Sequence, residues 1–249
     1  MSILEKKKGN LVYFQFEEFI NYDYLFNHLF SSRIGWDKDK IKMKEQISDL
    51  IEVPIENIIN VKQVHGTNIV VIDSNINNYQ DISQIEADGL VTNLPKMALI
   101  TYHADCVPVY FIDIKKKAIG LAHSGWKGTF NNISGKLIKK MEQRYNSKKE
   151  DILVGIGPSI GPCCYEVKDD LIQMFTEKYG QFDNLFVEDN DKVFLNLWRV
   201  IYLQILEEGV PKENIVFSNT CTSCNVDKFY SYRKEKGIDN RMAAVISLK

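Results

Sequence analysis

The chain has 249 residues, of which 45% are hydrophobic and 26% are charged. This length and composition are typical of a globular protein with a sizeable core, and they exclude an intrinsically disordered chain. With 31 basic and 33 acidic side chains the formal net charge is −2, so no electrostatic attraction to nucleic acid or to an anionic membrane is expected. A small molecule is the more natural partner.

The N-terminal segment and the cysteines indicate the compartment. Residues 1–8 carry charge without a following apolar stretch, and no window of the sequence is long and apolar enough to span a bilayer. Five cysteines, with Cys163 and Cys164 adjacent, do not resemble a disulfide framework. We therefore expect a cytoplasmic protein whose thiols are reduced or bind metal.

The hydrophobic pattern predicts alternating strands and helices. In the first half, strands are expected at residues 10–16, 25–30, 58–63, 69–72, 87–91, 97–101, 107–114 and 118–122, with one helix at 38–51. In the second half, helices are expected at 130–145, 168–179 and 195–209, and strands at 152–158, 214–218 and 242–248, the last two as a pair. No repeat or linker divides the chain, so we expect one domain over residues 1–249.

His65, Cys106 and His123 each lie in a short run of small, turn-forming residues at the end or flank of a predicted strand. Three such ligands suit a divalent metal ion with an open coordination position, which usually indicates chemistry rather than a structural role. The alternative is ordinary packing, because an isolated histidine or cysteine in an apolar setting is usually a core residue. His103, close to Cys106 in sequence, is a rival ligand or base.

A second group of cysteines has the spacing of half a zinc knuckle, with Cys221 and Cys224 separated by two residues. A complete site would require Cys163 and Cys164 to fold next to them, and adjacent cysteines rarely chelate one ion together. The sequence therefore does not predict a separate structural zinc.

Six segments in order carry a family resemblance. They are Gln63–Gly66, Ala87–Thr92, Ala104–Val109, His123–Thr129, Gly157–Val167 and Phe229–Lys234. Together they resemble the YfiH family, also called the laccase-domain or FAMIN-like family, over about residue 61 to the C-terminus. The resemblance implies an α/β (mixed α+β) fold with a large mixed β-sheet flanked by helices, of the cytotoxic necrotising factor and YfiH type.

The resemblance also implies a function. Family members are described as purine nucleoside phosphorylases that deaminate adenosine and cleave methylthioadenosine, and they were earlier labelled polyphenol oxidases. It implies adenosine, inosine and methylthioadenosine as substrates beside phosphate, and a zinc site, with copper as the alternative metal. The metal ligands correspond to His65, Cys106 and His123, so the resemblance assigns His103 to packing around the site. We expect a monomer as the simplest oligomeric state.

The residues of this set suit that chemistry. A metal held by two imidazoles and one thiolate keeps one positive charge, which can acidify a bound water or polarise a substrate atom. Deamination at C6 of adenine also requires a carboxylate to move protons, and Asp105 or Asp88 could do so. We therefore predict catalytic roles for Cys106, His123 and Asp105.

Substrate binding is expected from cationic and aromatic side chains. Phosphorolysis needs positive charge to hold phosphate against C1′, which Lys127, Arg233 and Arg241 could supply. Tyr232 could stack on a base, although alternating aromatic residues are commonly sheet packing. Arg33 is also predicted to bind substrate, in a turn where Trp36 replaces the second glycine usual in the family.

Two other functions stay open. The first is a cysteine hydrolase or amidase acting on a peptidoglycan precursor, with Cys106 as nucleophile and His123 as base; fold similarity between the family and toxin deamidases favours it. The second is a copper-dependent polyphenol oxidase. Four histidines without a His-x-His pair provide too few ligands for a multicopper centre. A binding module without catalysis would leave the three-ligand set unexplained.

Overall fold

The computed structural model describes residues 3–76 and 79–249, and its strands form two six-stranded sheets and a smaller one. The first sheet has the order β1 (Ile3–Lys8), β2 (Leu11–Phe16), β3 (Phe26–Ser31), β15 (Met242–Leu248), β7 (Ala98–His103) and β4 (Ile58–Ile59). The second has the order β14 (Ile215–Phe217), β10 (Ile152–Ile156), β8 (Val107–Asp113), β9 (Ala118–Ser124), β6 (Gly89–Thr92) and β5 (Ile69–Ile72). Both sheets mix parallel and antiparallel pairs.

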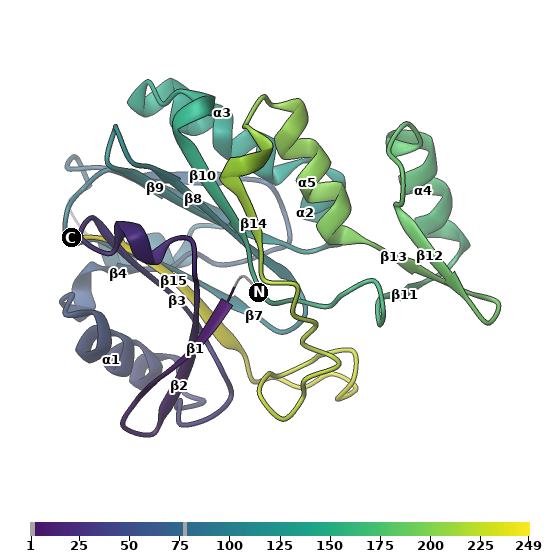
Figure 1. Ribbon diagram of the computed structural model, residues 1–249. Coiled ribbons are helices and arrows are strands. Elements are labelled where there is room, and N and C mark those ends of the chain that lie inside the picture. The colour runs from purple at the N-terminus through teal and green to yellow at the C-terminus, as the bar shows by residue number, and fades with distance from the viewer. Residues whose placement is uncertain (1–2, 77–78) are drawn as a thin grey trace.

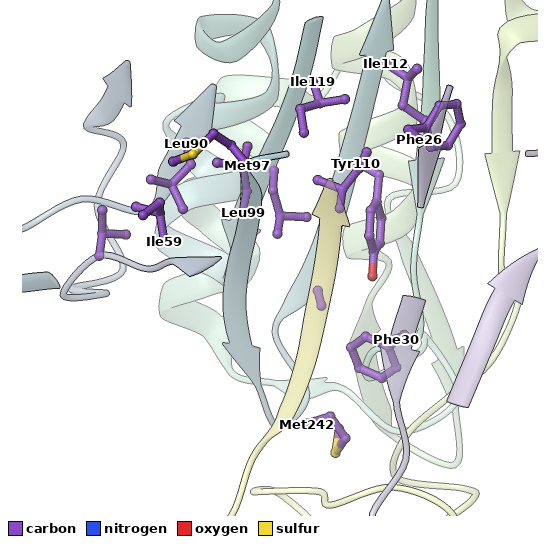
Figure 2. Packing of buried hydrophobic residues seen from close by; sticks show 14 of the residues in the cluster. Phe26, Phe30, Ile59, Leu90, Met97, Leu99, Tyr110, Ile112, Ile119 and Met242 are labelled. Atoms are coloured by element: carbon purple, nitrogen blue, oxygen red, sulfur yellow. The ribbon is translucent and has the colours of Figure 1, made fainter. Parts of the chain in front are cut away.

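The two large sheets pack against each other. Figure 2 shows Phe26, Phe30 and Leu99 of the first sheet beside Tyr110, Ile112 and Ile119 of the second. In β8, Tyr110 and Ile112 belong to this inner core, while the alternate residues Val109 and Phe111 belong to the core on the opposite face. Both faces of the strand are therefore buried, which explains its continuous apolar sequence.

Helices cover the outer faces. On the second sheet lie α2 (Trp126–Phe130), α3 (Ile133–Tyr145) and α5 (Leu197–Glu207), and α1 (Lys40–Ile51) covers the first sheet through Met43, Ile47 and Ile51 (Figure 1). The smaller sheet, of β11 (Glu166–Val167), β13 (Lys192–Leu195) and β12 (Phe186–Asp189), lies beside α4 (Asp169–Tyr179). Short 3₁₀ helices are η1 (Ile20–Tyr22), η2 (Ile55–Asn57), η3 (Tyr79–Gln84), η4 (Lys149–Asp151) and η5 (Lys212–Asn214).

The predicted mixed α/β fold with helices flanking large sheets is confirmed. Several details were wrong. The helix predicted at 130–145 is α3, which begins at Ile133 because Asn132 adopts a left-handed conformation (φ 53°) and its side chain caps the helix by accepting from the Gly135 amide; the short α2 before it was not predicted. The strands predicted as a final pair belong to different sheets: β14 pairs with β10, and β15 lies between β3 and β7.

Other elements were not predicted. The strand β1 has a largely charged sequence. The strands β12 and β13 form a hairpin that occupies residues up to Leu195, so α5 begins at Leu197 rather than at the predicted residue 195. Within the described residues, no helix has the length and apolar character needed to cross a membrane. One domain over residues 1–249 stays a prediction.

Candidate active site

His65 lies in the turn that follows β4, in a left-handed backbone conformation with φ 59°. This conformation is rare outside glycine and short polar residues, so local contacts must stabilise it. The Asp88 carboxylate does so, because it accepts hydrogen bonds from the amides of Val64 (3.2 Å), His65 (3.0 Å) and Gly66 (2.6 Å). Asp88 directly precedes β6 and is fully buried.

The same carboxylate orients His123, a residue of the neighbouring strand β9. His123 Nδ1 lies 2.8 Å from Asp88 Oδ1 and both side chains are buried, so only Nε2 remains for another partner. Burial raises the pKa of Asp88, but the hydrogen bond and charge of His123 outweigh it, and the pKa is lowered. Asp88 is therefore an ionised support for both histidines.

Cys106 completes the cluster from the turn between β7 and β8. Its sulfur and one ring nitrogen from each of His65 and His123 lie within 4.8 Å of one another. Burial opposes the thiolate, but the charge of His123 and hydrogen bonds from both histidines lower the pKa of Cys106 to about 6. Burial likewise opposes the imidazolium of His123, but the Cys106 charge and the Asp88 hydrogen bond raise its pKa to about 9.

This donor set fits a single zinc ion. Two imidazoles and a thiolate converge, and a carboxylate fixes one imidazole, as in catalytic zinc sites with one open position. The space beside the donors depends on Gly125, because a Cβ there would lie 3.1 Å from Cys106 Sγ and 3.1 Å from His65 Cδ2. His103 is excluded as a ligand, since its ring nitrogens already contact Thr101 Oγ1 and the Cys106 carbonyl.

The cluster opens into a cavity of about 610 Å³, a size typical of small-molecule sites. Its lining combines cations, aromatic rings and polar groups: Lys40, Arg233, Arg241, Tyr102, Trp126, Tyr165, Tyr232, Gln63, Asp105, and apolar residues. Among the described residues, none of the three cations forms an ion pair with a carboxylate. Three cations in a lining that holds the Asp105 carboxylate leave an excess of positive charge beside the cluster, which suits an anionic or phosphate-bearing substrate.

The predicted substrate residues divide into two groups. Tyr232, Arg233 and Arg241 line the cavity, whereas Arg33 and Lys127 are not among the described residues that line it. Arg33 forms an ion pair with Glu235 (3.1 Å) and hydrogen-bonds the Val226 carbonyl (2.6 Å). Its contacts are therefore structural in this conformation.

Asp105 lines the cavity with its carboxylate fully engaged. Oδ1 accepts from Thr222 Oγ1 (2.7 Å), and Oδ2 accepts from Ser231 Oγ (3.1 Å) and the Arg233 amide (2.7 Å). The bonds from Ser231 and Arg233 connect the turn before Cys106 to the segment that carries Tyr232 and Arg233, and the bond from Thr222 connects it to the Cys221–Cys224 turn. The catalytic role of Asp105 stays a prediction, and its contacts favour positioning of that segment.

Sequence reasoning missed Lys40, Tyr102, Tyr165 and Trp126 as lining residues. Lys40 Nζ lies 4.6 Å from the centre of the Tyr102 ring, and burial together with the charge of Arg241 lowers the pKa of Lys40. Lys40 is the first residue of a charged helix, so nothing local distinguishes it from a solvated lysine. Trp126 and Tyr165 lie inside the quoted motifs, which is the only signal that could have found them.

A family model described as Multi-copper polyphenol oxidoreductase laccase matches residues 31–249. The purine nucleoside phosphorylase YlmD of Geobacillus stearothermophilus is 34% identical over 220 residues, covering 86% of this chain and 80% of that protein. The purine nucleoside phosphorylase SERP0752 of Staphylococcus epidermidis is 34% identical over 224 residues, covering 89% and 78%.

Solved structures show the same fold. The crystal structure of Bacillus licheniformis hypothetical protein YfiH aligns with a TM-score of 0.87 at 26% identity, covering 98% of this chain and 99% of that one. YlmD from G. stearothermophilus aligns with a TM-score of 0.86 at 25% identity, covering 99% of each chain. The similarity therefore includes the elements that carry the three-residue cluster and the cavity.

Proposed function

We propose that this chain, which belongs to the YfiH family of the multi-copper polyphenol oxidoreductase laccase type, is a metal-dependent purine nucleoside phosphorylase. The observation that carries the proposal is a His-Cys-His cluster that opens into a cavity with four aromatic side chains and three cations that have no carboxylate partner among the described residues. Relatives about one-third identical are named purine nucleoside phosphorylases. We further propose adenosine, inosine and methylthioadenosine as substrates, an additional adenosine deaminase activity, and zinc as the metal.

Phosphorolysis requires the cavity to hold a phosphate ion near C1′ and to bind the purine base. A phosphate oxygen attacks C1′ while the bond from C1′ to the purine nitrogen breaks, and the electron pair leaves with the base. Lys40, Arg233 and Arg241 would hold the phosphate near C1′ and offset its charge. The rings of Tyr102, Tyr165, Trp126 or Tyr232 would stack on the purine.

The cluster would hold the metal through His65, Cys106 and His123. Bound zinc would supply a positive charge that polarises a substrate atom or acidifies a water molecule. Asp88 would keep Nε2 of His123 directed at the ion, because it occupies Nδ1. Asp105 would hold the Tyr232–Arg233 segment at the cavity wall through its hydrogen bonds from Ser231 Oγ and the Arg233 amide.

The cysteine hydrolase or amidase remains the second candidate because one observation favours it. Cys106, His123 and Asp88 would serve as nucleophile, base and orienting carboxylate, since His123 lies between the other two and the pKa of Cys106 is lowered to about 6. A peptidoglycan precursor would be the substrate. A multicopper oxidase is disfavoured, because neither remaining histidine has a ring nitrogen to offer the cluster. His28 accepts from the Phe16 amide, and His103, whose ring centre lies 5.1 Å from that of His123, has its two nitrogens on Thr101 Oγ1 and the Cys106 carbonyl.

Chromatographic product analysis tests the proposal. Zinc-loaded, untagged protein is incubated with adenosine and phosphate beside Cys106→Ala. Free adenine with ribose 1-phosphate from wild type alone is the expected result, and inosine would demonstrate deamination. Equal turnover by Cys106→Ala, or no product from either protein, would contradict the proposal.

Alkylation separates the two candidates. A metal-bound Cys106 thiolate is expected to resist iodoacetamide until the metal is chelated, because coordination occupies the sulfur. A nucleophilic Cys106 would be modified equally in metal-loaded and metal-free protein. Peptide mapping of Cys106 before and after chelation gives the answer, because the chain has four other cysteines that could also be protected. For its organisation and location, we further propose that the chain is a single cytoplasmic domain that acts as a monomer.

A further inference from the structure

Four cysteines from two distant parts of the sequence converge outside the site described above. Cys163 Sγ lies 3.5 Å and Cys164 Sγ 3.4 Å from Cys224 Sγ, and Cys221 completes a group whose sulfur atoms all lie within 4.8 Å of one another. None of the four belongs to the His65–Cys106–His123 cluster. All four are free thiols in the structure.

The sheet topology brings these cysteines together. The strands β10 and β14 are parallel neighbours at the edge of the second sheet, so the segments after them leave from the same side (Figure 1). Backbone hydrogen bonds from Ser159 N to the Thr220 carbonyl (3.2 Å) and from Thr222 N to the Ser159 carbonyl (3.0 Å) then align the two segments. Cys163 and Cys164 follow Ser159 in the first segment, and Cys221 lies between Thr220 and Thr222 in the second.

The sulfur geometry fits one tetrahedral ion better than disulfides. Zinc–sulfur bonds of about 2.3 Å place tetrahedral sulfur atoms about 3.8 Å apart, within the range found here. A disulfide joins one pair at about 2.05 Å, whereas Cys224 lies almost equally close to two partners. We propose that Cys163, Cys164, Cys221 and Cys224 bind a second zinc ion through four thiolates.

The surrounding backbone supports metal-bound thiolates. The Gly161 amide donates to Cys221 Sγ at 3.2 Å, and such donors stabilise a thiolate. Residue 161 must be glycine here, because a Cβ would lie 2.8 Å from the Trp198 ring and 3.3 Å from Cys163 Sγ. Amides of Cys164 and Tyr165 both bond the Gly161 carbonyl, which turns the two adjacent cysteines toward one ion.

The type of donor atom favours zinc at this site. Four soft thiolates in a tetrahedral arrangement favour zinc over magnesium, calcium or manganese, which prefer oxygen ligands. Binding would release the thiol protons to solvent without any change of oxidation state. With four protein ligands no coordination position stays open, so this ion would be structural rather than catalytic.

A zinc ion at this place would fix one wall of the cavity. The first segment carries Ile160 and Tyr165, and the second leads to Tyr232 and Arg233, all of which line the cavity. Between Cys221 and Cys224, Thr222 donates to the Asp105 carboxylate. The ion would therefore join the two segments that present part of the substrate surface, whatever reaction the cavity performs.

Metal counting tests the site independently of activity. Protein purified under reducing conditions and desalted is expected to hold about two zinc ions per chain by elemental mass spectrometry. Cys106→Ala is expected to retain about one, and the double variant Cys163→Ser/Cys224→Ser about one. One zinc in wild type, retained by the double variant, would overturn the proposal.

Cobalt spectroscopy keeps the test valid if the double variant fails to fold. In Cys106→Ala the four clustered cysteines are the only thiols. Its cobalt(II)-loaded form should therefore show strong near-ultraviolet thiolate-to-cobalt absorption, and all four thiols should resist iodoacetamide until chelation. Absence of this absorption, or a disulfide within the cluster in protein alkylated at cell lysis, would contradict the zinc site.

Discussion

Asp88 Oδ1 lies 2.8 Å from His123 Nδ1, and the same carboxylate accepts the backbone amides on both sides of His65. One buried aspartate thus connects two of the three proposed metal ligands, although 23 residues separate it from His65 and 35 from His123. It fixes the turn of one and the ring orientation of the other. Supports of this kind commonly determine how tightly a metal is held.

Asp88→Asn should weaken zinc binding at this cluster by about 10-fold to 100-fold, because the neutral amide supports His123 less well as a ligand. Competition with a zinc chelator measures the affinity. Asp73→Asn is the matched control, since the Asp73 carboxylate pairs with Arg144 and accepts from the Asn75 amide, and Asp73 belongs neither to the cluster nor to the described cavity lining. Equal affinities for Asp88→Asn and wild type would remove the supporting role of Asp88.

Gly125→Ala should reduce zinc binding without a large loss of folding stability. The backbone at residue 125 (φ −73°, ψ 178°) accepts any residue, but the new methyl would press on Cys106 Sγ and His65 Cδ2 at 3.1 Å. Gly66→Ala is the steric control, because its methyl would meet its nearest neighbours at 3.5 and 3.6 Å. Metal content and thermal unfolding measure the two effects; full metal occupancy of Gly125→Ala would contradict the prediction.

Arg241→Gln should raise the KM for phosphate about 10-fold or more, the loss expected for one charge-assisted hydrogen bond of about 1.5 kcal/mol. Arg241 lines the cavity and its described hydrogen bonds go only to the carbonyls of Ile238 and Asn240. Initial rates at varied phosphate measure the effect. Arg144→Gln, at a surface ion pair, is the control, and a similar change in both variants would argue against a phosphate site.

His28 should make the protein less stable in acid. Burial lowers the pKa of His28 from 6.5 to about 3, and its Nε2 accepts a hydrogen bond from the Phe16 amide, which only an unprotonated nitrogen can do. Between these values the unfolded chain binds a proton that the folded chain does not. The free energy of unfolding therefore falls with decreasing pH, by at most about 1.4 kcal/mol per pH unit from this group.

His28→Gln isolates that contribution, because the carboxylates that also titrate in acid are common to both proteins. Urea unfolding from pH 7 to pH 4 should show a shallower loss of stability for the variant below pH 6.5. Parallel curves for the two proteins would show that His28 titrates alike in folded and unfolded chains.

The sequence predicted those helices and strands whose own residues show a clear hydrophobic pattern. The apolar face of Ile133, Leu137, Ile138 and Met141 predicted a helix, and all four side chains are buried in α3. Strands buried on both faces, such as β8, were found from continuous apolar runs. In contrast, β1 has little apolar pattern and exists because it pairs with β2 along its whole length.

From the sequence we could predict that His65, Cys106 and His123 form one site, because each lies in a distinctive turn motif. The folded structure was needed to find that Asp88 holds both histidines, that Lys40 rather than Lys127 lines the cavity, and that Arg33 pairs with Glu235. It also decided that Cys163 and Cys164 meet Cys221 and Cys224. These contacts could not be predicted because they depend on which strands become neighbours in a sheet.

The parallel pairing of β10 with β14, and the position of β15 between β3 and β7, result from packing across the whole chain. No local sequence pattern specifies them.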